Sequence, residues 1–287
     1  MNNSRRDFLR NSALAGLALS MPFKNELMAM GGAHNSFGIQ LWSVKEALAK
    51  DTLGVLKHLS KSGFKKIESF EGEKGIFWGM KNTEFKKRMD ALGMKLVSSH
   101  CDTSNNFEQK AAEAAEIGMK YLICPYKGAQ KSIDDFKKIA AQFNEKGDLC
   151  KKYGIRFAYH NHDYSFKSMN GIYPQDILMK ETDSNLVDFE MDMYWVVTAG
   201  EDPMAWLKRY PNRFHLAHIK DRSRTPINQG QYESVDLGTG SINYPALLKN
   251  AKQWGLNYLF MEQEFYPNGS PLLAAETGAG YLKKIKF

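Results

Sequence analysis

Histidine and carboxylate side chains recur in this sequence at points where apolar segments end. Four of them each close a different segment: His160 in RFAYHNHDYSF, Asp192 in FEMDMYW, His218 in FHLAHIKD and Glu262 in YLFMEQE. Imidazole and carboxylate groups can bind divalent metal ions and can transfer protons. Which of these they do here depends on whether the fold brings the four segment ends together.

A repeated local pattern predicts how these segments are arranged. The segments SGFKKIES, LGMKLVSS, IGMKYLIC, YGIRFAYH and WGLNYLFM each place a glycine just before a strand-forming run. Glycine commonly ends a helix in the left-handed conformation, and β-branched and aromatic residues favour strands. Amphipathic segments such as NTEFKKRMDALG precede these glycines, with apolar residues at helical spacing. The chain therefore alternates helix and strand.

Completing this alternation gives eight strand candidates, which begin near Phe37, Lys65, Lys95, Tyr121, Arg156, Leu186, Phe214 and Tyr258. Strands that alternate with helices form parallel sheets, and eight such units in about 250 residues match a (β/α)8 TIM barrel. We therefore predict one α/β barrel domain over residues 37–287. A doubly wound open sheet is the alternative, but QLWSVKEAL, rather than a glycine-rich phosphate loop, follows the first strand.

The barrel prediction brings the four segment ends to one place. Active sites of TIM barrels lie at the carboxyl ends of the strands, so His160, Asp192, His218 and Glu262, on strands five to eight, should converge. Two imidazoles and two carboxylates suit one divalent ion such as Mn²⁺, Zn²⁺, Co²⁺ or Fe²⁺ better than Ca²⁺. For each histidine taken alone, a hydrogen-bonded structural role is the alternative.

Further polar and aromatic residues lie at or just after the predicted strand ends. Candidates for proton transfer or charge stabilisation, besides Glu262, are Glu68, His100 and Lys220. Candidates for substrate binding are Trp42, Trp78, His162 and Glu264. Trp78 follows strand two in GIFWGMKN, where packing of the loop is an equal alternative to stacking on a sugar.

The N-terminal segment has the layout of an export signal. SRRDFLRNSALAGLALSMPF begins with basic residues, continues with a short apolar stretch and reaches Pro22. This order is typical of secretory signals, and SRRDFLR resembles the twin-arginine pattern. We therefore expect residues 1–33 to be a signal segment and the protein to be exported to the periplasm. A retained amphipathic helix is the alternative.

Composition narrows the class of protein further. Apolar residues make up 43% of the chain and aromatic residues 12%, which is typical of a globular protein. The net charge is +7, but basic and acidic residues are interspersed, so nucleic-acid binding is disfavoured. No apolar run is long enough to span a membrane, and three scattered cysteines exclude a disulfide framework. The oligomeric state stays open, and a homo-oligomer is compatible with the sequence.

Six segments resemble one known family: GIQLWSVKEAL, YHNHDYSF, DMYWVVTAGEDP, HLAHIKDR, VDLGTGSINYPALL and FMEQE. The chain is similar to the xylose isomerase-like TIM-barrel superfamily, in its branch of predicted sugar phosphate isomerases/epimerases, from about Phe37 to Phe287. The resemblance implies a metal ion held by a carboxylate on strand five, an aspartate on strand six, a histidine on strand seven and a glutamate on strand eight. Asp192, His218 and Glu262 match this pattern, whereas His160 stands where relatives often have glutamate.

Three functions follow from these observations. In an isomerase or epimerase of small carbohydrates, Glu262 would take a proton next to a carbonyl, and Glu68, Glu264 or His100 would return it. Lys220 would stabilise the resulting enediolate. In a lyase or hydratase, the same first step would be followed by loss of the aglycone from a keto-glycoside, and export favours such an unphosphorylated substrate. The third function, sugar binding without catalysis, stays open because His160 departs from the family pattern.

Overall fold

The computed structural model describes residues 36–228, 230–267 and 269–285, which form a closed parallel barrel. In this part of the chain eight strands close in the order β1-β10-β7-β6-β5-β4-β3-β2. They are β1 (Gly38–Gln40), β2 (Lys66–Phe70), β3 (Lys95–His100), β4 (Tyr121–Cys124), β5 (Arg156–His160), β6 (Val187–Asp192), β7 (Phe214–Ile219) and β10 (Tyr258–Met261). The predicted TIM barrel is confirmed, and the open sheet is excluded. The predicted signal segment lies outside the described residues.

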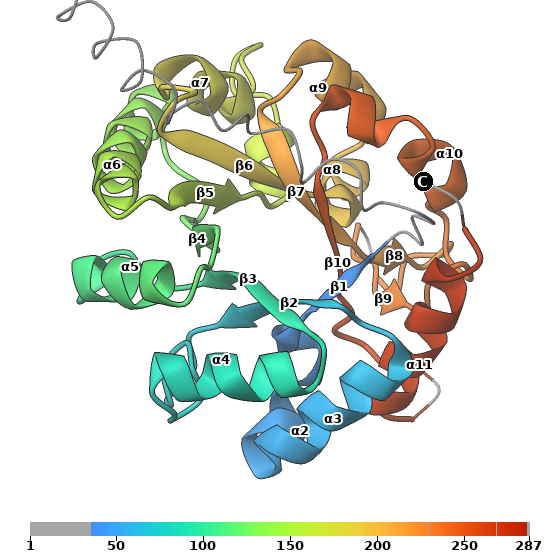
Figure 1. Ribbon diagram of the computed structural model, residues 1–287. Coiled ribbons are helices and arrows are strands. Elements are labelled where there is room, and N and C mark those ends of the chain that lie inside the picture. The colour runs from blue at the N-terminus through green and yellow to red at the C-terminus, as the bar shows by residue number, and fades with distance from the viewer. Residues whose placement is uncertain (1–35, 229, 268, 286–287) are drawn as a thin grey trace, which may run out of the picture. The chain divides into compact units, whose positions relative to one another are not determined.

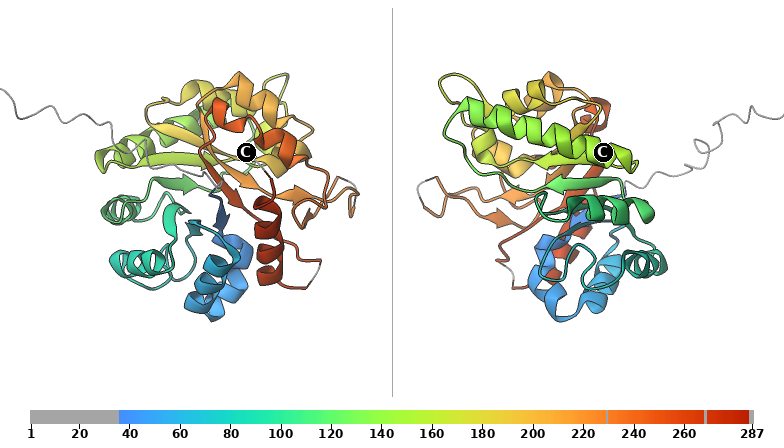
Figure 2. Two further views of the ribbon diagram at one scale, coloured as in Figure 1. Left: turned by 45° about the vertical axis from the view of Figure 1, so that its right-hand side comes forward. Right: turned by 90° about the vertical axis from the view of Figure 1, so that its left-hand side faces the viewer.

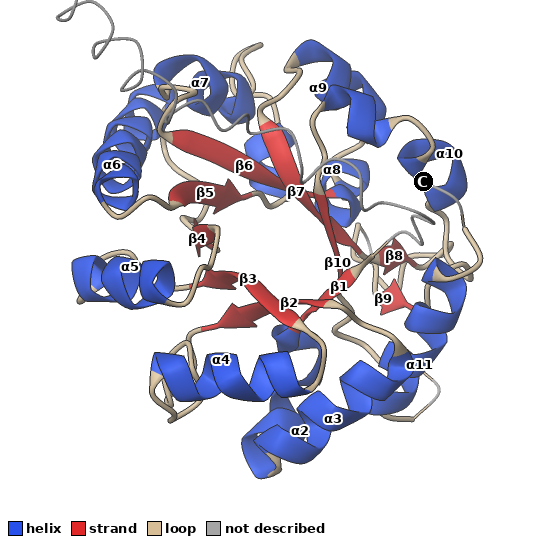
Figure 3. Cartoon of the chain, in the orientation of Figure 1, coloured by secondary structure: helices blue, strands red, loops and turns tan. Residues whose placement is uncertain are grey.

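Helices surround the strands as an outer ring (Figures 1 and 3). The α-helices are α2 (Lys45–Lys50), α3 (Thr52–Ser62), α4 (Asn82–Ala91), α5 (Phe107–Glu116), α6 (Ile133–Lys152), α7 (Pro174–Glu181), α8 (Met193–Thr198), α9 (Pro203–Arg209), α10 (Tyr244–Leu248) and α11 (Pro271–Leu282). Short 3₁₀ helices are η1 (Leu41–Val44), η2 (Asp163–Phe166) and η3 (Ala251–Trp254). A small antiparallel hairpin, β8 (Asp221–Arg222) with β9 (Ser234–Val235), projects from the barrel after β7 (Figure 2).

The glycines that were expected to end helices do so in the left-handed conformation. Their φ angles are 109° at Gly63, 65° at Gly93, 79° at Gly118, 75° at Gly154 and 111° at Gly255. A residue with a Cβ atom adopts such angles only with strain, so glycine suits the turn into each strand. These five turns begin β2, β3, β4, β5 and β10, and they explain why a repeated short pattern was enough to locate the strands.

Strand β6 ends at Asp192, the residue that was predicted to close this segment. The aromatic residues that follow belong to α8, which begins at Met193. The reason is local: the Asp192 side chain accepts a hydrogen bond from the Trp195 backbone N–H at 3.2 Å and caps the new helix. The cap uses Asp192 Oδ1, and Oδ2 of the same carboxylate makes no hydrogen bond with the described residues.

The barrel interior changes from apolar to polar along the strands. One end is filled by a buried cluster of Val97, Tyr121, Ile123, Ala158, Leu216 and Phe260. Towards the carboxyl ends, alternate residues of β6 that share one face are acidic, and Glu190 and Asp192 are both fully buried. Buried carboxylates need cationic or hydrogen-bonding partners, and these partners form the site described below.

None of the helices in the described residues is long and apolar enough to cross a membrane. The three cysteines, Cys101, Cys124 and Cys150, are buried free thiols. A disulfide framework was already excluded by the sequence.

Two glycines in helices give a matched test of barrel packing. A Cβ atom at Gly147 in α6 would lie 2.7 Å from the backbone oxygen of Leu186, just before β6, whereas one at Gly280 in α11 would meet nothing within 4 Å. Alanine normally favours a helix over glycine by about 0.8–1 kcal/mol. We therefore expect Gly280→Ala to stabilise the protein and Gly147→Ala to destabilise it by about 1–3 kcal/mol, because the backbone must move. Urea unfolding of both variants measures this difference, and equal stabilisation by both would contradict it.

Candidate active site

The four residues predicted to bind a metal ion lie together at the carboxyl end of the barrel. We call His160, Asp192, His218 and Glu262 the upper quartet. Their nearest ligand atoms all lie within 4.8 Å of one another, and all four side chains are buried. His160 Nε2 lies 3.2 Å from His218 Nδ1, which in turn lies 3.2 Å from Glu262 Oε2. Asp192 Oδ2 lies 3.5 Å from His160 Nε2 and 3.8 Å from His218 Nδ1.

These distances fit a divalent cation. Ligands at 2.0–2.2 Å from a tetrahedral ion are about 3.3–3.6 Å apart, close to the separations found here. Asp192 Oδ2 is also buried without a hydrogen-bond partner among the described residues. A buried carboxylate oxygen without a partner is costly unless a cation neutralises it. The upper quartet could therefore hold one metal ion.

Burial and neighbouring charges shift the pKa values of the upper quartet in different directions. Burial, together with the neighbouring imidazoles of His218 and His100, keeps the pKa of His160 well below its usual value, so that its lone pair is free. Burial opposes ionisation of Glu262, but Lys220 and His218 outweigh it and hold the pKa of Glu262 well below the ordinary range. Burial lowers the pKa of His218 less than Glu190 and Glu262 raise it. A proton on His218 and a metal cation therefore compete for the same carboxylates.

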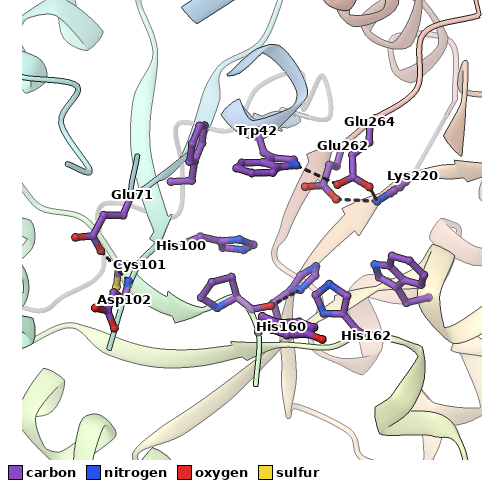
Figure 4. Close-up of a pocket in the computed structure, with 14 residues that line it drawn as sticks. Trp42, Glu71, His100, Cys101, Asp102, His160, His162, Lys220, Glu262 and Glu264 are labelled. Atoms are coloured by element: carbon purple, nitrogen blue, oxygen red, sulfur yellow. Dashed lines mark hydrogen bonds and ion pairs between the residues drawn. The ribbon is translucent and has the colours of Figure 1, made fainter. Parts of the chain in front are cut away.

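Lys220 connects the upper quartet to the pocket rim. It is 2% exposed, and its Nζ lies 3.4 Å from Glu262 Oε2 and forms a closer ion pair with Glu264. Glu264 also accepts a hydrogen bond from Trp42 Nε1 at 3.0 Å. The predicted residues Trp42, Lys220, Glu262 and Glu264 thus form one chain of contacts along one side of the site (Figure 4).

A second group of four residues lies deeper in the barrel, and the sequence prediction contained only part of it. We call Glu68, His100, Glu190 and the shared His218 the lower quartet. His100 reaches the pocket, whereas Glu68 is fully buried and is absent from the pocket lining, so it cannot touch a substrate there. Glu190 was missed, although it precedes Asp192 by two residues and therefore shares its face of β6. That shared face was the available signal.

A pocket of about 310 Å³ opens above the two quartets. Its aromatic walls are two groups of contacting rings, Trp42 with Phe70, and His162 with Tyr126 and Trp195. The floor includes His100, His160 and Glu262, and the far end is formed by Glu71, Cys101 and Asp102. Aromatic faces with a few polar groups between them are well suited to a small ring-shaped ligand.

The two histidines of the HNH segment have different positions. His160 belongs to the upper quartet, whereas His162 lies in the pocket wall with its ring 5.3 Å from Trp195 and 5.0 Å from Tyr126. Burial and the neighbouring His160 lower the pKa of His162 to about 3, so it is a neutral wall residue. Asn161 between them joins the strand ends, because its amide exchanges two hydrogen bonds of 3.2 Å with the Asp192 backbone.

Trp78 does not line the pocket. Its side chain is 8% exposed, its Nε1 donates to Ser69 Oγ at 3.2 Å, and its ring packs edge-on against Phe70 at 5.0 Å. The structure thus favours the packing role that the sequence left open. Through Phe70, Trp78 supports the pocket wall from behind.

Known proteins share this fold and parts of this sequence. Residues 56–285 match the xylose isomerase-like TIM barrel family. An inosose dehydratase from Clostridium perfringens is 27% identical over 215 residues, covering 70% of this chain and 68% of that protein.

Solved structures extend the similarity. A sugar phosphate isomerase/epimerase from Parabacteroides distasonis is 29% identical with a TM-score of 0.74, covering 92% of this chain and 98% of its own. The IOLI protein, solved with a bound zinc atom, shares the fold at 17% identity and a TM-score of 0.67, over 85% of this chain and 95% of its own. The match of the family over most of the chain, together with the closed barrel, establishes that this protein belongs to the xylose isomerase-like TIM-barrel family.

Proposed function

We propose that this protein is a divalent-metal-dependent lyase of the dehydratase type, which removes a β-substituent from a keto-carbohydrate. The proposal rests on two side chains at the pocket floor that differ in chemical type, the carboxylate of Glu262 and the imidazole of His100. Glu262 comes from the end of β10, and its Oε1 makes no hydrogen bond with the described residues. The group three strands away around the barrel is an imidazole, His100 on β3, and not a second carboxylate.

This pair suits elimination. A metal ion bound by the upper quartet would polarise the substrate carbonyl as a Lewis acid. Glu262 Oε1 takes a proton from the carbon beside the carbonyl, and Lys220 Nζ stabilises the negative charge that develops on oxygen. The carbon–oxygen bond at the β position then breaks as a carbon–carbon double bond forms, and His100 protonates the departing oxygen. The products are an unsaturated ketone and water or an alcohol.

Glu190 orients the His100 ring for this proton transfer. Its Nε2 lies 2.7 Å from Glu190 Oε2, and its Nδ1 makes no hydrogen bond with the described residues. Because His100 lines the pocket, Nδ1 is the nitrogen that can reach a leaving group. The C. perfringens relative, an inosose dehydratase, supports an elimination of this kind.

The pocket favours a substrate without a phosphate group. Its lining contains four carboxylates, Glu71, Asp102, Glu262 and Glu264, and Lys220 is the only lysine or arginine among the described residues that line it. Lys220 is already paired with Glu262 and Glu264. A phosphate dianion would meet net negative charge, so we propose a neutral keto-sugar or keto-glycoside. Such a substrate also fits the expected export of the protein.

Isomerisation or epimerisation is the second candidate. The P. distasonis relative, which this chain covers almost completely, is a sugar phosphate isomerase/epimerase. Glu264 is the specific residue that favours it here, because it is a second, partly exposed carboxylate at the pocket and could return a proton.

The test is product analysis with and without metal. Purified protein is stripped with a chelator, reloaded with Mn²⁺, Zn²⁺ or Co²⁺, and incubated with an inosose and with a glycoside carrying a ring ketone. We expect metal-dependent appearance of an unsaturated ketone, followed by its ultraviolet absorbance and by NMR. An epimer or isomer without unsaturated product would establish the second candidate. If the protein bound no metal ion and converted no keto-carbohydrate, both enzyme functions would be excluded and sugar binding without catalysis would be the function that remains.

A further inference from the structure

His218 belongs to both quartets through its two ring nitrogens. Nδ1 faces the upper quartet, at 3.2 Å from both His160 Nε2 and Glu262 Oε2. Nε2 faces the lower quartet, at 2.7 Å from Glu68 Oε1 and 3.4 Å from Glu190 Oε2. The ring is fully buried. Whichever nitrogen carries the proton therefore decides which quartet can use His218 as a metal ligand.

The distances distinguish the two quartets. Neighbouring ligand atoms of the upper quartet are 3.2–3.8 Å apart, as expected around a cation. In the lower quartet, short and long separations alternate. Nε2 of His218 lies 2.7 Å from Glu68, and Nε2 of His100 lies 2.7 Å from Glu190, whereas the cross distances are 3.3 and 3.4 Å. Separations of 2.7 Å are those of charge-assisted hydrogen bonds. The lower quartet is therefore joined by protons.

Glu68 is the most firmly held member of the lower quartet. Its Oε1 accepts hydrogen bonds from Gln40 Nε2 at 2.8 Å and from His218 Nε2 at 2.7 Å, and its Oε2 accepts one from Ser98 Oγ at 2.6 Å. These partners come from β1, β7 and β3, and Glu68 itself lies on β2. A carboxylate that β1 and β3 anchor independently of His218 can fix the plane of the His218 ring and the position of its proton.

We propose that Glu68 is a positioning residue of the metal site, which holds the proton of His218 on Nε2 and so leaves the Nδ1 lone pair for the ion. The inference rests on metal binding by the upper quartet as proposed above, but not on the reaction. Carboxylates that accept the second N–H of a ligating histidine orient the ring and raise its basicity. Here the carboxylate and the histidine are 150 residues apart, and only barrel closure brings them together.

The experiment measures the affinity of the full chain for Co²⁺ and Zn²⁺ by competition with a chromophoric chelator. We expect Glu68→Gln to weaken binding roughly 10–100-fold and to change the visible absorption spectrum of the bound Co²⁺. Ser98→Ala keeps the charge of Glu68 but removes one of its anchors, and we expect a smaller loss in the same direction. Circular dichroism and urea unfolding of the metal-free variants report whether they fold.

Glu190→Gln is the matched control. It makes the same substitution at another fully buried carboxyl of the lower quartet, but Glu190 bonds mainly to His100, so we expect a clearly smaller loss of affinity and an unchanged Co²⁺ spectrum. Equal losses for Glu68→Gln and Glu190→Gln would show that the hydrogen bond between His218 Nε2 and Glu68 has no special effect, and would overturn the proposal. Binding of two ions per chain, reduced to one by either variant, would also overturn it, because the lower quartet would then be a metal site. If the wild-type protein bound neither ion, metal binding itself would fail, together with the proposed function.

Discussion

Replacing Glu262 by glutamine should lower kcat roughly 10²–10⁴-fold, the range expected when a well-placed general base is removed. Glu262 is 6% exposed and lines the pocket, and Lys220 and His218 keep it ionised by holding its pKa well below the usual value against the effect of burial. Glutamine has nearly the same shape but cannot accept the proton. The measurement is steady-state turnover with the metal-loaded protein on the keto-carbohydrate that it converts.

Glu264→Gln is the control for this prediction. Glu264 lies two residues further along the chain, also lines the pocket and also pairs with Lys220, but it does not belong to the upper quartet. We expect a much smaller loss of kcat and a larger change in KM, because Glu264 orients Trp42 at the rim. Metal affinity measured for both variants separates loss of the base from loss of the ion. Similar losses of kcat in the two variants would contradict the assignment of Glu262 as the base and favour the two-carboxylate isomerase.

The second large effect is on stability. Lys220→Met should destabilise the metal-free protein by about 3–5 kcal/mol, the cost of removing one partner from a buried ion pair. Lys220 is 2% exposed, and burial alone would lower its pKa, but Glu262, Asp192 and Glu264 reverse that effect and raise it. Methionine fills a similar volume, so the loss reports the uncompensated carboxylates and not a cavity.

Bound metal should reduce this cost, because a divalent cation neutralises the same carboxylates that Lys220 faces. Urea unfolding of Lys220→Met, with a chelator and with saturating Mn²⁺, tests both statements. The control is Lys138→Met, which removes an exposed ion pair with Asp135 on α6 and should leave stability unchanged. A loss for Lys220→Met no larger than that of the control, or equal losses with and without metal, would contradict this account of the charges.

The elements of this barrel could be predicted because their signals are local. A glycine that ends a helix in the left-handed conformation, followed by a β-branched run, depends only on neighbouring residues. The same holds for the strand ends that carry His160, His218 and Glu262. The end of β6 at Asp192 is set locally as well, because the Asp192 side chain caps the helix that begins at Met193.

The sequence could not predict how deep each side chain lies inside the barrel. Glu68 and His100 were grouped as candidates for proton transfer, but the structure places Glu68 below the pocket and His100 at its floor. Glu190 lies on the same face of β6 as Asp192, and periodicity alone cannot say which of them a ligand reaches. Trp78 follows its strand as Trp42 does, yet it turns into the core against Phe70.

Sequence alone thus determined the barrel class, the order of its units and the residues at the strand ends, since each follows from the conformational preferences of a few adjacent residues. Only the tertiary structure decided which of those residues meet. The stagger between neighbouring strands sets the height of each side chain along the barrel axis, and that stagger is fixed when the sheet closes. Closure of the barrel brings Glu68 within 2.7 Å of His218 and makes the His218 imidazole a member of both quartets.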